Sequence, residues 1–402
     1  MNKEKRRVPK LRFPGFTEDW EQRKLEDVCN VYDGTHQTPR YTNSGVMFVS
    51  VEDIETLESN KYITEEDFKS EFKVFPEYGD ILLTRIGDVG SANVILDEIK
   101  RAYYVSLALL KPKDINSLFL LALLSSSSVQ SEIWRRTLHI AFPKKINKNE
   151  INKVIVNQPS IPEQKKIGKL FFSLDQTITL HQRKLEHLKL KKKALLQKLF
   201  PKNGERYPEL RFPGFTDAWE QCKLSDILVE RNEQQVETNE YPLMSFVQGY
   251  GVIPKGERYD RSFLVLDQSK KYKRTELGDF IYSSNNLETG SIGINKTGKA
   301  VISPVYSIFY GVSIGDSQFI GIMSLLPRFI AKMIRFRQGV VYGQWRIHEK
   351  DFLDISILIP SVDERTKITK LILSLEELIT LHQRKLDHLQ LQKKALLQQM
   401  FV

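Results

Sequence analysis

Two stretches of the chain carry a heptad pattern of apolar residues, which predicts two long helices. Apolar positions alternate at spacings of three and four, as in helices that pair into a coiled coil. The first stretch has seam positions at Ile167, Phe171, Leu174, Ile178, His181, Leu185, Leu188 and Leu195. The second has them at Ile368, Ile372, Leu375, Ile379, His382, Leu386, Leu389 and Leu396. We expect the two helices to pair with each other in antiparallel orientation.

The first helix should begin at the Pro-bounded loop before Glu163, since Pro162 suits a first helical turn. About 38 residues at 1.5 Å each would make it about 57 Å long. His181 and His382 fall at the midpoints of the two helices, so an antiparallel seam would bring them close together. We interpret them as polar residues that fix the register, with metal or proton chemistry as the alternative.

Further leucines give each helix a second apolar stripe outside the seam, which predicts a protein partner. They are Leu180, Leu190, Leu196, Leu381, Leu391 and Leu397. The first helix is also basic, with ten Lys or Arg against three Asp or Glu between Glu163 and Phe200. These charges belong either to a solvated face or to a surface near a DNA backbone.

The chain is a tandem duplication. Residues 173–200 return at 374–401 with 20 of 28 positions identical, and residues 11–28 return at 210–227 with 13 of 18 identical. Each half therefore has a repeated opening, a variable middle and a repeated close. The openings combine turn formers with large aromatics such as Trp20 and Trp219, which indicates loops docked on a core.

The two middles show strand patterns separated by turn formers, followed by shorter helical patterns. Strands are expected at VMFVSV (46–51), DILLTRI (80–86), ANVIL (92–96) and YYVSLALL (103–110), and helices across 117–138 and near 324–336. The predicted fold class is α+β, with two β-rich domains joined by two long antiparallel helices and an internal pseudo-two-fold repeat. The predicted boundaries are 1–160 and 210–360 for the β-rich domains, 161–200 and 361–402 for the helices, and 201–209 for the linker.

Composition favours a globular protein with a polyanionic partner. The 402 residues are 41% hydrophobic and 27% charged, and the formal net charge is +10. The first residues lack the apolar core of a secretory signal, and no apolar run is long enough to span a membrane. The two cysteines, Cys29 and Cys222, are not at equivalent repeat positions. We expect a cytoplasmic protein with ordinary thiols.

No motif predicts catalysis or metal binding by this chain. GxSxG, HExxH and paired CxxC motifs do not occur. The stretch GINKTGKA at 293–300 approaches a phosphate-binding loop, but Ala300 stands where a hydroxyl is needed and a strand pattern follows. We therefore predict no catalytic residues and no metal ligands.

The repeated openings and helices should bind the same partner twice, whereas the two dissimilar middles should recognise two different ligands. For a basic protein this describes a reader of a two-part DNA sequence with a defined gap. Several motifs resemble those of specificity subunits of type I restriction-modification systems. They are the LRFPGFT..WEQ.KL.D openings, GDILLTR (79–85), GDFIYSS (278–284), PSIPEQKKI (159–167) and the LHQRKL.HL.L.KKALLQ closes.

The resemblance covers nearly the whole chain and implies that the two middles are target recognition domains for double-stranded DNA. It implies that the helices set the spacer and dock two modification subunits, and that restriction subunits join the full complex. S-adenosylmethionine, ATP and Mg²⁺ would act only on those partner subunits, so this chain needs no cofactor. One departure is PSVDERTKI in the second half, where Asp363 and Arg365 replace Pro162 and Gln164. It puts equal docking of the two partner copies in doubt.

Base-reading candidates come from polar loops beside the predicted strands. The first domain offers Thr35, His36, Gln37, Thr38, Arg40, Tyr41, Arg85, Lys144 and Lys145. The second offers Ser283, Ser284, Asn285, Asn286, Lys296, Gln344 and Arg346, with Trp345 as either a reader or a core residue. Arg and Gln can contact base edges in pairs, and Lys suits phosphates. A structural role in turns is the alternative for both groups.

Two other functions remain open on sequence alone. A purely protein-binding scaffold would keep its behaviour after changes at Arg40 and Lys145. A self-sufficient methyltransferase or nuclease would show turnover as a purified chain. The base sequence that each middle reads does not follow from these patterns.

Overall fold

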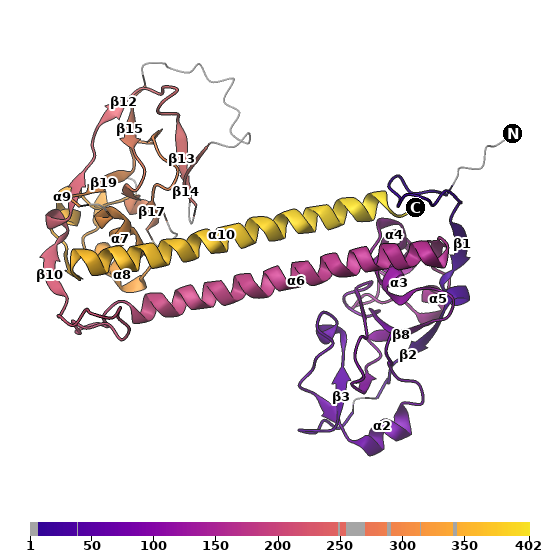
Figure 1. Cartoon of the computed structure of the whole chain (residues 1–402). Coiled ribbons are helices and arrows are strands. Elements are labelled where there is room, and N and C mark those ends of the chain that lie inside the picture. Colours follow the sequence, from indigo (N-terminus) through magenta and orange to yellow (C-terminus); the bar gives the residue numbers. More distant parts are fainter. Residues whose placement is uncertain are drawn as a thin grey trace. The chain divides into compact units, whose positions relative to one another are not determined.

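Two helices of 38 residues each, α6 (Ile161–Lys198) and α10 (Val362–Gln399), link the two β-rich domains of the chain (Figure 1). The computed structural model describes residues 7–37, 39–247, 250–254, 270–287, 291–313, 315–340 and 344–402. Contacts divide the chain into two units, 1–183 with 382–402 and 184–381. Each unit holds one domain and one part of each long helix, and the predicted fold class is confirmed.

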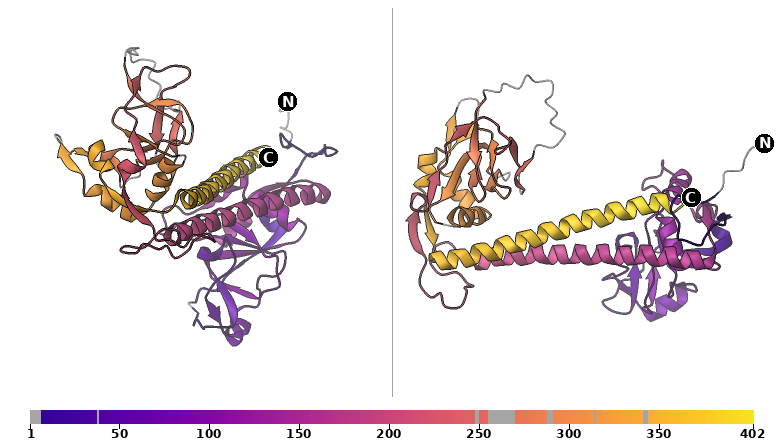
Figure 2. Two further views of the ribbon diagram at one scale, coloured as in Figure 1. Left: turned by 60° about the vertical axis from the view of Figure 1, so that its left-hand side comes forward. Right: turned by 45° about the horizontal axis from the view of Figure 1, so that its top comes forward.

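The long helices are antiparallel. In the first unit Asp175 pairs with Lys393 at 2.5 Å, and the Nδ1 atoms of His181 and His382 lie 2.9 Å apart. A later residue of α6 thus contacts an earlier residue of α10, which defines an antiparallel pair. In the second unit Lys192 pairs with Glu376, also at 2.5 Å. Figure 2 shows the helices side by side in both views. The two ion pairs are equivalent in the repeat, because Glu376 lies 201 positions after Asp175 and Lys393 lies 201 positions after Lys192. Each unit therefore contains one copy of the same interhelical contact.

The seam positions divide into two groups in the structure. Ile178, Leu185, Leu188, Leu375, Leu386 and Leu389 are buried, and Leu174, His181, Ile379 and His382 are half-buried. Ile167 and Phe171 belong to the core of the first domain, and Ile368 and Ile372 to that of the second. Leu396 and Leu195 pack against the same two cores. The ends of the heptads thus fasten the domains to the helices, which a seam drawn from spacing alone does not predict.

The first domain is built from three small sheets and short helices. One sheet has the order β2 (Cys29–Asp33), β8 (Leu107–Pro112), β5 (Ile81–Thr84), β6 (Ala92–Val94). Another has β4 (Tyr62–Ile63), β3 (Val46–Val49), β7 (Arg101–Tyr103), and β1 (Glu21–Lys24) pairs with β9 (Ile155–Gln158). The helices are α1 (Leu25–Val28), α2 (Glu65–Glu71), α3 (Ser117–Leu124), α4 (Ser127–Arg136) and α5 (Lys148–Asn152), with a 3-10 turn at Val51–Asp53.

The second domain repeats this plan. Its four-stranded sheet is β11 (Leu228–Glu230), β19 (Ser307–Gly311), β16 (Phe280–Tyr282), β17 (Ile292–Ile294). The other sheets join β12 (Gln234–Gln235), β15 (Tyr272–Thr275) and β18 (Ala300–Ile302); β10 (Glu220–Lys223) and β22 (Ser356–Ile359); β13 (Met244–Val247) and β14 (Gly251–Pro254); β20 (Gln338–Val340) and β21 (Gln344–Arg346). Its helices are α7 (Asp316–Met323), α8 (Pro327–Ile334) and α9 (Glu349–Leu353), with 3-10 turns at Leu224–Asp226 and Ser284–Asn286.

The predicted short helices differ from the observed ones. The helical pattern across 117–138 is split into α3 and α4, because Ser126 accepts a hydrogen bond from the Val129 amide and caps a new helix. The helix expected near 324–336 is α8, and α7 precedes it without having been predicted. The strands predicted at 46–51, 80–86 and 92–96 are β3, β5 and β6, and the one at 103–110 is shared by β7 and β8.

The repeated openings close each domain over the start of a long helix. Arg12 makes two hydrogen bonds to the buried carboxylate of Glu163, and Arg211 makes the same two to Glu364. Trp20 packs edge-on against Phe401 in the first domain, as Trp219 does against Phe200 in the second. Backbone bonds of 2.9 Å from Leu11 to Gln399 and from Leu210 to Lys198 complete the two copies.

The departures at the second helix entry are contacts inside the domain. The Gln164 side chain accepts from the Asn116 amide that begins α3, and Arg365 pairs with Asp316 at the start of α7. Gly168 allows α3 to pack directly on α6, since a Cβ there would lie 2.6 Å from the Phe119 nitrogen. In the described parts of the chain, no helix is both long and apolar enough to cross a membrane.

Candidate nucleic-acid interface

In the first domain, Arg85 ties together three segments that sequence reasoning singled out separately. It follows β5 and is buried, and its guanidinium pairs with Asp33 and donates to the Ile146 carbonyl at 3.1 Å. Asp33 begins the 33–41 loop, and Ile146 follows Lys144 and Lys145. In this structure Arg85 positions the surrounding loops, and its own charge is used inside the domain.

A backbone hairpin presents the two predicted lysines. The Leu138 amide donates to the Lys145 carbonyl at 2.8 Å, and the Gly87 amide donates to the Lys144 carbonyl at 2.8 Å. Both lysine side chains are exposed, while the adjacent Ile146 is fully buried and anchors the hairpin. The hairpin therefore holds two cations at a defined place next to the end of β5.

The 33–41 loop combines a structural base with exposed polar groups. The Thr35 hydroxyl bonds Glu71 and accepts from the Gln37 amide, so it shapes the turn. Gly34 is required there because a Cβ would lie 2.5 Å from the Tyr103 carbonyl oxygen. His36, Gln37, Arg40 and Tyr41 are exposed. Thr38 lies outside the described residues.

In the second domain, the predicted residues come together at the corresponding place. Ser283 and Ser284 follow β16 and are buried, and the Ser284 hydroxyl accepts from the Ile347 amide at 2.9 Å. The Asn285 side chain accepts from the Trp345 amide at 2.6 Å. Trp345 and Arg346 are exposed, with Arg346 3.6 Å from Glu349. Asn286 and Gln344 belong to the same segments, but their side chains are not among those described.

The two clusters have similar contacts although the middles align poorly in sequence. The Ile146 amide bonds the carbonyl of Arg85, and the Ile347 amide bonds the side chain of Ser284. Lys145 pairs with Leu138 as Arg346 pairs with Gln338. One frame thus carries Lys144 and Lys145 in the first domain and Trp345 and Arg346 in the second.

Lys296 does not join this cluster. It lies on the turn after β17 and pairs with Glu376 of α10. Burial favours a raised pKa for Glu376, but the positive charges of Lys192 and Lys296 outweigh it and lower that pKa below its ordinary value. Lys296 therefore fastens the second domain to its helix.

Sequence reasoning missed a group of residues around the hairpin of the first domain. Trp134 and His139 are in ring contact, and Ile140 and Phe142 are exposed at the hairpin tip. The signal was the run HIAFP, which places large apolar residues directly before two lysines in a segment otherwise interpreted as loop.

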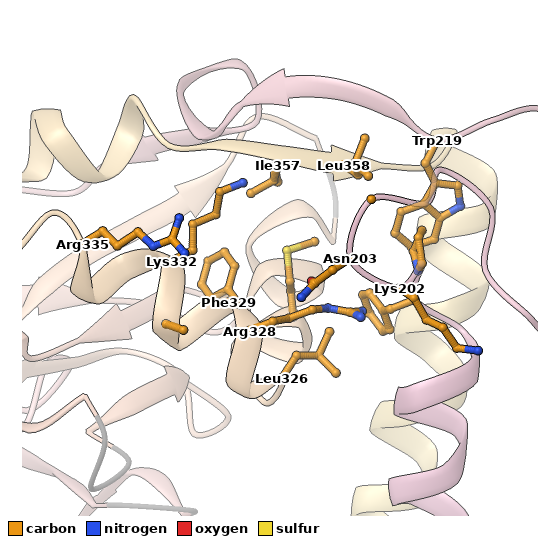
Figure 3. Close-up of a pocket in the computed structure, with 15 residues that line it drawn as sticks. Lys202, Asn203, Trp219, Leu326, Arg328, Phe329, Lys332, Arg335, Ile357 and Leu358 are labelled. Carbon is orange, nitrogen blue, oxygen red and sulfur yellow. The ribbon is translucent and has the colours of Figure 1, made fainter.

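A separate cavity of about 440 Å³ lies in the second domain (Figure 3). Phe200, Trp219 and Phe329 contribute apolar walls, and Lys202, Arg328, Lys332 and Arg335 contribute positive charge. Burial lowers the pKa of Arg328, and no acidic residue lines the cavity. None of the sequence-predicted DNA-binding residues lines it.

The thiols and acidic groups give no chemical site in the described chain. Burial raises the pKa of Cys29 to about 12 and that of Cys222 to about 11, so both thiols stay protonated at neutral pH. Among the residues whose positions are described, no three His, Cys, Asp or Glu side chains gather in a way that would hold a metal ion.

Known proteins resemble this chain in sequence and fold. The family model of the type I restriction modification DNA specificity domain matches residues 17–190. The MjaX type I restriction enzyme specificity subunit described for Methanocaldococcus jannaschii is 24% identical over 405 aligned residues, which cover 94% of this chain and 92% of that protein.

The fold agrees with a solved structure. The type I restriction-modification S subunit from M. genitalium superposes with a TM-score of 0.67 at 12% identity, covering 98% of this chain and 99% of that one. The family match covers the first domain and most of α6, and the duplication carries the same frame into the second half. Residues 17–190 therefore match the type I restriction modification DNA specificity domain, and nearly the whole chain resembles specificity subunits of type I restriction-modification systems in sequence and fold.

Proposed function

We propose that each β-rich domain reads one half of a bipartite, asymmetric DNA target. The observation that carries this proposal is the pair of equivalent clusters with different exposed side chains. Lys144 and Lys145 stand where Trp345 and Arg346 stand in the other domain. A shared frame with different surfaces is what two different half-sites require.

The exposed residues have the chemistry for both kinds of DNA contact. Lys144 and Lys145 suit phosphate oxygens, which position a protein on the duplex without reading its sequence. Arg40, Gln37 and Arg346 can make bidentate contacts to guanine or adenine in the major groove. Their exposure in the described structure leaves these groups available to DNA.

The long helices would set the spacer between the half-sites and dock two modification subunits. Leu180 and Leu190 on α6, and their repeat equivalents Leu381 and Leu391 on α10, are exposed outside the seam. Because the repeat presents this stripe twice, it would offer equivalent surfaces to two copies of one partner. Leu196 and Leu397 pack on the domain cores instead.

Methylation and cleavage would belong to partner subunits, which would hold S-adenosylmethionine, ATP and Mg²⁺. This chain would supply sequence recognition in the cytoplasm, with restriction subunits completing the complex. Turnover by the purified chain alone would contradict this division of labour.

Methylome sequencing of the host tests the proposal. Removal of this chain should abolish methylation at one bipartite motif, and restoring it should return that motif. Replacing residues 29–160 with those of another family member should change one half-site and leave the other half and the spacer unchanged. A change in both half-sites, or in neither, would contradict modular reading. Unchanged targeting after mutation of Arg40 and Lys145 would instead favour a protein-only scaffold.

A further inference from the structure

Ile140 and Phe142 are the most exposed large apolar residues in the described chain. Their side chains are 99% and 104% exposed, so the domain covers essentially none of their surface. Large apolar side chains are normally at least partly buried. Two of them at one tip, separated by one residue, indicate a surface shaped for contact with another molecule.

The base of this tip is braced although the tip itself is not packed. Trp134 and His139 have ring centroids 4.2 Å apart, and the His139 ring nitrogen lies 2.8 Å from the Trp134 carbonyl oxygen. The Lys144 ammonium lies 4.9 Å from the centre of the Trp134 ring. With the backbone bond between Leu138 and Lys145, these contacts hold Ile140 and Phe142 outward on a fixed platform.

Positive charge surrounds the apolar tip. Lys144 and Lys145 are exposed beside it. The carboxylates of Glu132 and Glu150 form ion pairs with other cations. Glu132 pairs with Arg135 and Arg136, and Glu150 pairs with Arg136 and Lys153. Exposed apolar side chains next to lysines suit DNA, which has charged phosphates outside and stacked apolar base faces inside.

We propose that Phe142, supported by Ile140, inserts between adjacent base pairs of the DNA beside the first half-site and partly unstacks them. Proteins that kink DNA use apolar wedges of this kind, flanked by residues that hold the phosphates. Lys144 and Lys145 would hold the backbone on either side of the wedge. The inference rests on the proposed DNA-reading function and assigns the contact to two residues.

The wedge would couple reading to the ease of deforming the target. Pyrimidine–purine steps unstack most easily, so the first domain would favour such a step at the contacted position. Preference would then appear at a base pair whose edges no side chain reads. The hairpin of the second domain includes residues outside those described, so the inference concerns the first domain alone.

The test uses the full chain assembled with its modification subunits and a duplex that carries the target motif. 2-Aminopurine is placed in turn at positions through the half-site read by the first domain, because its fluorescence rises when stacking is lost. The wild-type complex should show one position with raised fluorescence. Phe142→Ala should abolish that signal and weaken specific binding roughly tenfold or more, as expected when one aromatic contact to a base is lost.

Matched variants separate the wedge from folding and from assembly. Phe142→Trp keeps a large ring and should retain the signal, whereas Ile140→Ala should weaken it. Ile99→Ala removes a half-exposed apolar side chain from another turn of the same domain and should change neither binding nor fluorescence. Because Phe142 is fully exposed, Phe142→Ala should leave the melting temperature unchanged.

Each contrary result has a distinct meaning. Full affinity and full fluorescence with Phe142→Ala would overturn the wedge while leaving the proposed function intact. Loss of modification subunits from the Phe142→Ala complex would assign the tip to a protein contact and would also overturn the wedge. A wild-type complex without any sequence preference would reject the proposed function, and the wedge with it.

Discussion

Glu163 and Glu364 are buried carboxylates at repeat-equivalent positions, and each holds an arginine of the opening segment through two hydrogen bonds. Glu163→Gln should destabilise the first domain by roughly 3 kcal/mol, because it removes the negative charge that compensates the Arg12 guanidinium at a buried site. Urea denaturation of the full chain measures the loss, and hydrogen exchange should place it in residues 11–20.

Glu364→Gln should produce the same loss in the second domain, with exchange increased in residues 210–219 instead. Glu150→Gln, at a more exposed carboxylate with lysine and arginine partners, should cost far less. An equal effect of Glu163→Gln and Glu150→Gln would contradict a structural role for the buried pair. Sequence reasoning could not find this pair, because 151 residues separate Arg12 from Glu163 and no local pattern links them.

Among the elements, the junction between α6, α10 and the turn after β17 is sensitive to pH. Its carboxylate is Glu376, whose pKa is lowered by Lys192 and Lys296 against the opposing effect of burial. The folded chain then binds fewer protons than the unfolded chain, for which the glutamate value is roughly 4.3. The stabilisation is therefore complete above that value and is lost as pH falls through the lower folded-state pKa.

Denaturation of wild type and Glu376→Gln between pH 3 and 7 tests this sign. The difference in unfolding free energy should be largest near neutral pH and shrink towards pH 3. Asp175→Asn is the matched control, because Asp175 is the repeat equivalent, pairs with Lys393 and is more exposed than Glu376. Its difference should be smaller at every pH. A Glu376→Gln difference that grows on acidification would reject the assignment.

Single elements were the most predictable part of the chain. The heptad spacing predicted both long helices, since the apolar period is a local property of the sequence. Their antiparallel pairing was predicted from the duplication, because a whole β-rich domain separates the two helices. The ends of the seam were less predictable, because Ile167 and Phe171 contact a domain core that only the folded chain creates. The break between α3 and α4 depends on a serine cap, which competes with the apolar period that runs across it.

At the scale of the whole molecule, the duplication predicted two similar units. In the structure each unit has an interhelical ion pair and an arginine–glutamate pair between its opening and its long helix. The candidate interface was only partly predictable. Arg85 and Ser284 were both chosen from the sequence, but their equivalence depends on backbone bonds to Ile146 and Ile347. The exposure of Phe142 could not be predicted from the sequence, because only the folded structure distinguishes an exposed aromatic side chain from a buried one.

The matching backbone bonds of Leu11 to Gln399 and Leu210 to Lys198 attach both openings to the end of a long helix in the same way. In the second domain, nine residues, 201–209, join the helix end to the opening. Fusing Val402 to Met1 would place eleven residues there, Val402 and residues 1–10. A chain that starts at Glu205, runs through this fusion and ends at Gly204 should therefore assemble the same two units. Methylome sequencing should find its motif unchanged, and a new or reversed motif would show that the position of the termini helps to define the target.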